Sequence, residues 1–270
     1  MTDLIRQKQD QLKECLRSMG SVLVAFSSGV DSTFLLKMAH EVLGDHAVAV
    51  TARSGIFPSR EYEQACAFCK KEGIRHIILD TDPLSVEGFR ENPPDRCYHC
   101  KHAIFQSFSR IAGEQGLSCV AEGSNVDDMG DYRPGMRAVK ELKIRSPLRE
   151  AGLTKQEIRT LSREMGLSTW DKPSCACLAS RISYHEEITG EKLKMTDLAE
   201  QKLMEYGFTQ VRVRMQGRTA RIELPKEDLD TFFRPDIRSS VTAYLHKLGY
   251  LYVSLDLDGF QSGSMNKVLQ

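Results

Sequence analysis

Short apolar runs alternate with stretches of helical periodicity along the first two thirds of the chain. The apolar runs have the length and composition of buried strands and lie at 21–28, 47–52, 76–80 and 117–125. Apolar residues recur every three or four positions in the stretches that predict helices, at 1–19, 33–44, 60–73, 103–116 and 153–166. Strands that alternate with helices are typical of a parallel sheet with helices on both faces, so we expect an α/β fold.

The pattern changes after residue 185. Beyond it, the sequence predicts the order helix, strand, strand, helix, strand, at 189–207, 209–215, 219–224, 235–249 and 251–257. This order is typical of a separate, small α+β unit. We therefore expect one domain over 1–185 and a smaller α+β domain over 186–270.

Two irregular segments interrupt the pattern, and both carry paired cysteines. Residues 88–101 include two consecutive prolines, which cannot continue a helix, so we expect a loop there. Pro173 lies in the second segment, 169–181, where we also expect irregular structure. Because neither segment follows the alternation of strands and helices, we expect functional residues in them.

The composition excludes several classes of protein. The chain has 270 residues, 41% of them hydrophobic, which is enough for a full core and about two domains. Lys plus Arg and Asp plus Glu both number 37, so no overall basic field attracts a nucleic acid, and we expect no such partner. The chain has neither a long apolar span nor a signal-peptide pattern, so we expect a cytoplasmic protein with no membrane partner.

Eight cysteines are many for a reducing compartment, where structural disulfides are rare. They form three close pairs and two single residues: Cys66 and Cys69, Cys97 and Cys100, Cys175 and Cys177, and then Cys15 and Cys119. The first pair shares one face of a predicted helix, and we expect that pair and both single residues in the core. The other two pairs are candidates for chemistry.

The turn 27–32, with the sequence SSGVDS, lies between the first buried strand and the next helix. Backbone N–H groups at a helix N-terminus bind anions, so this turn predicts phosphate binding, with an ordinary polar loop as the alternative. The turn matches neither GxxxxGK[ST] nor GxGxxG. It resembles instead the SGGxDS pyrophosphate loop of the N-type ATP pyrophosphatases, and it departs from that pattern at Ser28, where glycine is usual.

Enzymes of that superfamily cut ATP between the α and β phosphates and adenylate a substrate oxygen. The resemblance implies contacts to ATP or pyrophosphate from five residues, namely Ser27, Ser28, Gly29, Asp31 and Ser32. Asp31 is the natural ligand for Mg²⁺, which prefers carboxylate and phosphate oxygens. A second superfamily segment, G-[ST]-N-x-x-D, is matched at 123–128, so we expect Asn125 and Asp128 at the nucleotide; an Asx turn is the alternative.

Four segments together resemble the LarE family of ATP-dependent sulfur transferases, in order and in spacing: 92–101, 122–148, 170–182 and 211–224. The resemblance implies an enzyme that adenylates a carboxylate of pyridinium-3,5-dicarboxylic acid mononucleotide and converts it to a thiocarboxylate. This reaction lies on the route to the nickel-pincer nucleotide. The resemblance further implies ATP and Mg²⁺ as cofactors, a small nucleotide as substrate, and a homo-oligomer.

Family members obtain sulfur either from a sacrificed cysteine or through a 4Fe-4S cluster that three cysteines hold. The resemblance implies the cluster branch, because members that sacrifice a cysteine lack the pair Cys97 and Cys100. The resemblance then implies Cys177 as the third cluster ligand, and Cys175 is the alternative for that place. Either Cys175 or Cys177 is the catalytic residue that delivers sulfur. A separate sulfide donor would supply the sulfur. A four-cysteine zinc site and cysteines without metal remain alternatives.

Arg212 and Arg214 alternate on a predicted strand and therefore project from one face, where two guanidinium groups can bind a phosphate. The resemblance supports this, because members bind the substrate phosphate with second-domain residues; a solvated, charged sheet face is the alternative. Ser180 and Arg181 directly follow the cysteine turn, so we expect them at the substrate site.

Three rival functions remain open. A tRNA-thiolating enzyme shares the pyrophosphate loop, but the balanced charge and the absence of a recognisable RNA-binding module argue against it. An amidotransferase or NAD synthetase would leave the cysteine pairs unexplained. A nucleotide-binding redox sensor without enzymatic activity is the third, and substrate-dependent formation of AMP would argue against it.

Overall fold

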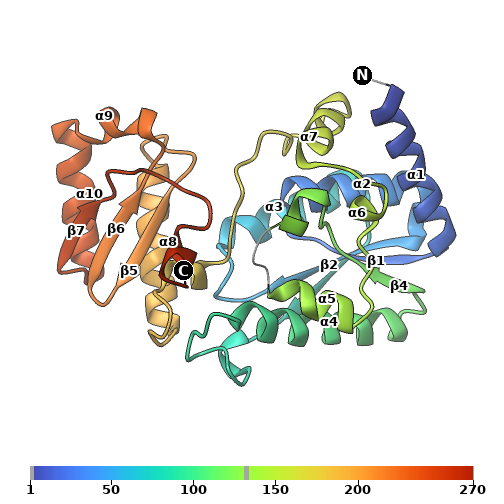
Figure 1. Ribbon diagram of the computed structural model, residues 1–270, viewed down its shortest axis with the longest axis horizontal. Helices are drawn as coiled ribbons and strands as arrows, with labels where there is room; N and C mark the ends of the chain where they lie inside the picture. The colour runs from blue at the N-terminus through green and yellow to red at the C-terminus, as the bar shows by residue number, and fades with distance from the viewer. Residues whose placement is uncertain (1–2, 131–133, 270) are drawn as a thin grey trace. The chain divides into compact units, whose positions relative to one another are not determined.

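The computed structural model describes residues 3–130 and 134–269 (Figure 1). Contacts among residues divide the chain into two compact units. Unit 1 comprises Met1–Asp82 and Cys97–Cys175, and unit 2 comprises Pro83–Arg96 and Ala176–Gln270. The domain boundary after residue 185 stays a prediction.

Unit 1 is built on a four-stranded parallel sheet, which confirms the predicted α/β fold. The strand order is β3-β2-β1-β4, and the strands are β1 (Val22–Ala25), β2 (Ala47–Arg53), β3 (His76–Asp80) and β4 (Cys119–Ala121). In register, Val22 of β1 lies opposite Ala47 of β2 and Cys119 of β4. Parallel strands end on one edge of the sheet, so the turns after β1 and β4 lie at the same edge.

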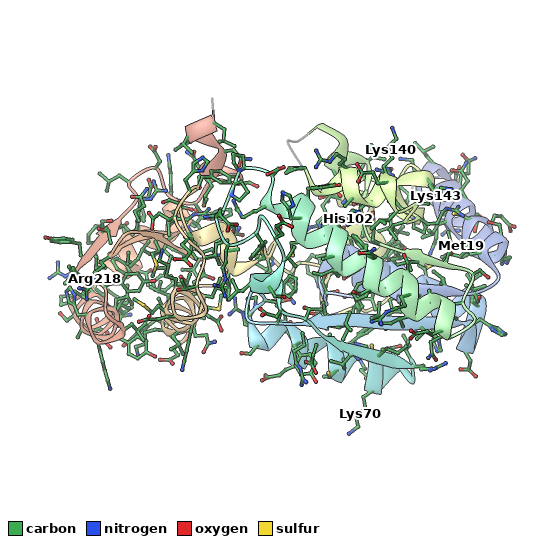
Figure 2. The ribbon with its side chains drawn as sticks, turned by 90° about the horizontal axis from the view of Figure 1, so that it is seen from below. Met19, Lys70, His102, Lys140, Lys143 and Arg218 are labelled. Atoms are coloured by element: carbon green, nitrogen blue, oxygen red, sulfur yellow. The ribbon has the colours of Figure 1, made fainter. Side chains whose placement is uncertain are left out.

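Helices cover both faces of this sheet, since alternate residues of β1 point into two separate cores. Val22 and Val24 pack against α1 (Asp3–Met19), α2 (Val30–Leu43), α3 (Ser59–Glu72), α6 (Pro147–Glu150) and α7 (Lys155–Glu164). Leu23 packs on the other face with α4 (Arg96–Glu114) and α5 (Gly135–Glu141). Figures 1 and 2 show α4 lying along that second face.

Unit 2 has a three-stranded sheet in the order β5-β6-β7. Strands β5 (Arg212–Gln216) and β6 (Thr219–Glu223) are antiparallel, and β7 (Tyr252–Leu255) runs parallel to β6. One sheet face forms a core with α8 (Gly190–Met204), α9 (Leu229–Phe232) and α10 (Pro235–Leu248). Val213, Met215 and Ile222 point into this core, so the residues between them point to the other face.

A segment from before α4 also packs within unit 2. The side-chain amide of Asn92 donates to the carbonyl oxygens of Ile182 (3.1 Å) and Ser183 (2.7 Å). The Asn92 carbonyl in turn accepts a hydrogen bond from His185 N. These bonds fix Pro83–Arg96 against the chain that follows the second cysteine segment.

The predicted loop at 88–101 is wrong in its last part. Turns continue to residue 95, and α4 begins at Arg96, two residues after the second proline. Prolines before a helix are compatible with its start, because the first N–H groups have no partner inside the helix. The Cys97 and Cys100 pair therefore lies in the first helical turn.

The cysteines predicted in the core differ in burial. Cys69 is fully buried, whereas Cys15 and Cys119 are half-buried and pack at the margin of the core. Cys66 is also half-buried but is not part of that core, so its predicted place was wrong. Burial raises the pKa of the Cys69 thiol to about 12 and that of Cys15 to about 11. Within 3–130 and 134–269, every helix is too short or too polar to cross a membrane.

A chain of hydrogen bonds fixes the end of β1 across the sheet. Thr51 Oγ1 donates to the Phe26 carbonyl at 2.8 Å, and His76 Nε2 lies 2.8 Å from the same hydroxyl oxygen. Because the threonine has one hydroxyl hydrogen, His76 Nε2 must be the donor in the second bond. Burial lowers the pKa of His76, which keeps its ring neutral. Phe26 directly precedes the turn 27–32.

We expect His76 to make the protein less stable as the pH falls from 7 to 5. The unfolded chain binds a proton at His76 near pH 6.5, whereas the folded chain resists it, so stability present above that pH is lost below it. In His76→Gln the free energy of unfolding should therefore vary less over this range. Urea denaturation at pH 7, 6 and 5 measures the difference. His46→Gln, at an exposed position, is the control, and equal slopes for H76Q and the parent would contradict the prediction.

Candidate active site

The turn after β1 leads directly into helix α2. Gly29 is the N-cap of α2 and provides no side-chain cap, so the first N–H groups of the helix are available to an anion. The hydroxyl oxygens of Ser27 and Ser32 lie 3.1 Å apart beside it. A Cβ on Gly29 would lie 3.4 Å from Ser27 Oγ and 3.9 Å from Ser32 Oγ. Glycine therefore keeps open the space beside both hydroxyls, as a bound phosphate requires.

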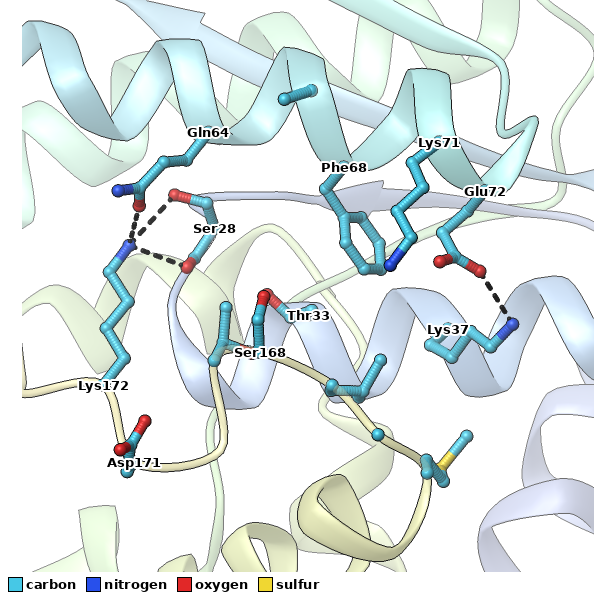
Figure 3. Close-up of a pocket in the computed structure, with 15 residues that line it drawn as sticks. Ser28, Thr33, Lys37, Gln64, Phe68, Lys71, Glu72, Ser168, Asp171 and Lys172 are labelled. Atoms are coloured by element: carbon cyan, nitrogen blue, oxygen red, sulfur yellow. Dashed lines mark hydrogen bonds and ion pairs between the residues drawn. The ribbon is translucent and has the colours of Figure 1, made fainter.

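Ser28, where the turn departs from the pyrophosphate-loop pattern, has a φ of 53°. This is the left-handed region, which glycine adopts freely and serine rarely. Ser28 Oγ lies within hydrogen-bond distance of the Glu61 carbonyl (3.0 Å) and carboxylate (3.1 Å), and Lys172 Nζ donates to the Ser28 carbonyl at 3.0 Å (Figure 3). These contacts hold the serine in a conformation that usually belongs to glycine.

The predicted acidic residues meet beside the start of α2. Asn125 Nδ2 donates to Asp31 Oδ1 at 3.4 Å, and the Asn125 backbone N–H donates to Asp128 Oδ2 at 2.9 Å. Lys155 Nζ lies 2.5 Å from Asp31 Oδ2. Burial raises the pKa of Asp31, Lys155 opposes this shift, and the negative charge of Asp128 adds to it. The structure thus brings together three predicted residues and one that was missed.

Lys155 gave no recognisable signal in the sequence. It is the first residue of α7 and lies between Thr154 and Glu157, which form the capping box, so the sequence predicts an ordinary surface lysine there. Glu61, which binds Ser28 and Lys172, and Gln64, which binds Lys172, were missed for the same reason, since both lie among charged positions of α3.

Tight packing holds the segment after β4 against α2. A Cβ on Gly123 would lie 3.0 Å from Ser32 N and 3.2 Å from the Asp31 carbonyl carbon, so a larger residue would push the segments apart. Glu122 is buried, and its carboxylate accepts hydrogen bonds from Ser146 Oγ (2.5 Å) and Ser124 Oγ (2.7 Å). This packing places Asn125 beside Asp31.

These residues fit a magnesium ion of the kind that nucleotide enzymes use. Mg²⁺ is usually held by one or two carboxylates together with substrate phosphates. Asp31 supplies a carboxylate beside the turn, and Asp128 is close enough to raise its pKa. The remaining ligands would come from phosphate and water, so no dedicated cage is required.

A cavity of about 570 Å³ lies in unit 1 next to this turn, within the size range of small-molecule sites (Figure 3). It is lined by Ser28 and by residues of α2, α3 and the segment 165–172. Lys37 and Glu72 form an ion pair of 2.8 Å on its wall, and Lys172 lies beside Ser28. The cavity wall therefore includes part of the phosphate loop.

The Cys97 and Cys100 pair shares one face of the first turn of α4. Cys100 is buried and Cys97 is half-buried. Tyr98, between them, lies under the Arg137 guanidinium of α5 at 3.5 Å and donates to Glu141 Oε2 at 2.8 Å. Residues 131–133, which are part of the segment 122–148, lie outside the described residues.

The second cysteine pair spans the division between the two units. Cys175 is the last residue of unit 1 and is exposed, whereas Cys177 belongs to unit 2 and is half-buried. Among residues 3–130 and 134–269, no three His, Cys, Asp or Glu side chains gather to hold a metal ion. Cys97 and Cys100 lie three residues apart on α4, and Cys175 and Cys177 belong to a separate segment.

Arg181 is fully buried and organises the turn that contains Cys177. Its guanidinium forms a two-pronged ion pair with Glu200 (2.8 and 2.9 Å). Arg181 Nη1 also donates to the carbonyls of Ala176 (2.8 Å) and Cys177 (3.1 Å). Ser180 Oγ donates to the same Cys177 carbonyl at 2.8 Å. These contacts favour a structural role for Arg181 over the predicted contact with substrate.

Arg212 and Arg214 lie on the sheet face opposite the core of unit 2. Arg214 binds the buried Glu223 carboxylate with two nitrogens (3.0 and 2.9 Å) and donates to the Ser180 carbonyl at 2.7 Å. The Arg212 guanidinium lies 5.3 Å from the centre of the Phe260 ring. The two arginines share a face, as predicted, and their role in phosphate binding stays a prediction.

We expect Glu200→Gln to destabilise the protein by about 3 kcal/mol, because it leaves a buried guanidinium without its counter-charge. Urea denaturation measures the loss. The control is Glu205→Gln: the Glu205 side chain is 64% exposed in its pair with Lys202, so this substitution should cost below about 1 kcal/mol. Equal losses in the two variants would show that the Arg181 pair does not carry this stability.

Comparison with known proteins shows which proteins this chain is similar to. No protein-family model matches the chain. An uncharacterised protein of Synechocystis sp. is 41% identical over 266 residues, 98% of this chain and 99% of that protein. One component of the glutamine-hydrolysing GMP synthase of Thermoplasma volcanium is 27% identical over 228 residues, which are 76% of this chain and 70% of that component.

A third relative carries a specific name. The pyridinium-3,5-bisthiocarboxylic acid mononucleotide synthase of Lactiplantibacillus plantarum is 38% identical over 263 residues, which are 97% of this chain and 95% of the synthase. An identity of this size over nearly all of both chains shows common family membership, and it agrees with an α/β unit whose phosphate loop opens onto an uncapped helix. The chain belongs to the LarE family of ATP-dependent sulfur transferases.

Proposed function

We propose that this protein adenylates a carboxylate of pyridinium-3,5-dicarboxylic acid mononucleotide and converts it to a thiocarboxylate. The observation that carries the proposal is the open turn 27–32 at the uncapped start of α2, with the Asp31 carboxylate beside it. The named synthase, which is similar over nearly the whole chain, supports the substrate class.

The reaction has two steps. A carboxylate oxygen of the substrate attacks the α-phosphorus of ATP, the bond to the β-phosphate oxygen breaks, and pyrophosphate leaves. Sulfide sulfur then attacks the carbonyl carbon of the acyl-adenylate, and AMP leaves with the bonding electron pair. The second step exchanges one oxygen for one sulfur and consumes no oxidant or reductant.

The residues of unit 1 act on the first step by binding the negatively charged phosphate groups of ATP. The N–H groups at the start of α2 and the hydroxyls of Ser27 and Ser32 hold the departing pyrophosphate. Asp31 would hold a Mg²⁺ ion, which would neutralise phosphate charge. Lys155, which pairs with Asp31, would release that carboxylate to the ion. Binding of charge and correct positioning therefore account for catalysis of this step.

The substrate phosphate is bound in unit 2 in this proposal. Arg212, Arg214 and Arg221 share the sheet face opposite the core, and Glu223 and Asp256 pair with the last two. Guanidinium groups bind phosphate oxygens by paired hydrogen bonds, so this face suits a phosphate monoester. Ser180 presents its backbone carbonyl to Arg214 and orients that guanidinium.

The sulfur source is the second part of the proposal. Cys97 and Cys100 on one turn of α4 support an iron-sulfur cluster, with Cys177 or Cys175 as the third ligand. Sacrifice of one of the last two cysteines is the competing source.

We expect Asp31→Asn to slow substrate-dependent release of pyrophosphate by about 100-fold or more, because it removes the carboxylate that holds Mg²⁺. The measurement is pyrophosphate release from ATP with pyridinium-3,5-dicarboxylic acid mononucleotide present. Asp45→Asn, at an exposed position after α2, is the matched control and should retain full activity. Full activity of D31N would overturn the assignment.

Metal content separates the sources of sulfur. We expect protein purified without oxygen to contain about four irons and four acid-labile sulfides per chain. Cys97→Ser should lose the iron and still release pyrophosphate, because the thiols lie outside the phosphate loop. Zinc in place of iron would identify a structural site. Absence of both metals, with loss of H₂S mass from Cys175 or Cys177 after one turnover, would identify a sacrificed cysteine.

A further inference from the structure

Lys172 has a position that neither the predicted motifs nor the proposed chemistry explains. It lies three residues before Cys175, and its ammonium reaches the phosphate loop (Figure 3). Lys172 Nζ lies 3.0 Å from the Ser28 carbonyl oxygen and 3.4 Å from Ser28 Oγ. The same nitrogen binds Glu61 Oε2 at 2.7 Å and Gln64 Oε1 at 2.6 Å. All three hydrogens of the ammonium are therefore used within this cluster.

The contact with the Ser28 carbonyl fixes the orientation of one peptide group. In a planar trans peptide the C=O and the following N–H point in opposite directions. When Lys172 holds the Ser28 oxygen on its own side, the Gly29 N–H points to the other side. The Ser28 φ of 53° is part of the same arrangement, and it is unfavourable for serine without such contacts.

Helix α7 fixes Lys172 in place. Arg159 Nη2 donates to the Lys172 carbonyl at 2.8 Å, and Arg159 Nη1 donates to the Trp170 carbonyl at 2.7 Å. The first residue of the same helix, Lys155, binds Asp31. One helix thus anchors both the residue that holds Ser28 and the residue that holds Asp31, so the loop is organised before any ligand arrives.

We propose that Lys172 is a positioning residue, which holds the Ser28–Gly29 peptide so that the Gly29 N–H is presented to the pyrophosphate group of ATP. The inference rests on the proposed function, in which the turn 27–32 binds pyrophosphate. Lys172 acts through the backbone of Ser28 and does not itself contact the phosphate. Glu61 neutralises the lysine and holds the Ser28 hydroxyl.

The test measures binding of inorganic pyrophosphate with Mg²⁺ to the full chain by calorimetry. Lys172→Met should weaken binding about tenfold and raise the KM for ATP, while the KM for the pyridinium substrate stays unchanged. Lys172→Arg keeps a donor for the Ser28 carbonyl and should stay within about threefold of the parent. Lys70→Met, an exposed lysine of the neighbouring α3 (Figure 2), is the matched control and should bind normally.

A second substitution distinguishes positioning from direct contact. Glycine adopts a positive φ without strain, so Ser28→Gly should restore most of the affinity that K172M loses, measured against S28G alone. A lysine that touched the phosphate would not be replaced in this way. Normal binding by K172M, or no rescue by S28G, would overturn the proposal. Failure of the parent protein to bind pyrophosphate would instead overturn the proposed function of the loop.

Should K172M unfold, as judged by circular dichroism, Glu61→Gln gives the same information in a folded protein. It removes the counter-charge of Lys172 but leaves an amide oxygen for both Ser28 Oγ and Lys172 Nζ. Positioning through the Ser28 carbonyl predicts a loss of pyrophosphate affinity below about threefold. A tenfold loss in E61Q would show that the ion pair, and not the orientation of the peptide, supports binding, and would overturn the proposal.

Discussion

The site depends on one constraint, the abrupt change from a buried parallel strand to a helix that starts without a side-chain cap. Strand β1 is fixed by neighbours on both sides, and Thr51 fixes the Phe26 carbonyl just beyond its end. The orphan N–H groups of α2 consequently have one orientation and no internal acceptor. Gly29 leaves space open beside the Ser27 and Ser32 hydroxyls. Ser28 fixes the conformation of the turn through its hydrogen bond to the Glu61 carbonyl.

The sequence predicted the parts of the site that follow from strand order. Asp31 and Asn125 come from turns after β1 and β4, which are neighbours in the sheet, so their meeting follows from a parallel arrangement. Lys155 and Lys172 contact the turn from segments that follow β4, the last strand of unit 1. No periodic pattern in the sequence predicts which groups the ammonium of such a lysine contacts. The start of α4 was missed because the prolines break a helix on their N-terminal side only.

The burial and ion pairing of Arg181 give it a different role from the one that the sequence predicted. Arg181, adjacent to the cysteine turn, looked from sequence like a ligand for substrate, yet its guanidinium holds two carbonyls of that turn against Glu200. Burial and a bidentate partner cannot be predicted from residues 177–181 alone, since they depend on α8, which follows in the chain. The backbone around Cys177 is thereby tied to unit 2, independently of what its thiol does.

The burial of the remaining thiols affects how the chain handles reactive sulfur. Burial raises the pKa of the Cys15 and Cys69 thiols, so both stay protonated at pH 7. Sulfide exchange and oxidation both proceed through the thiolate, so these side chains are slow to form persulfides or mixed disulfides. A cysteine-rich protein can in this way carry labile sulfur without diverting it into its own core.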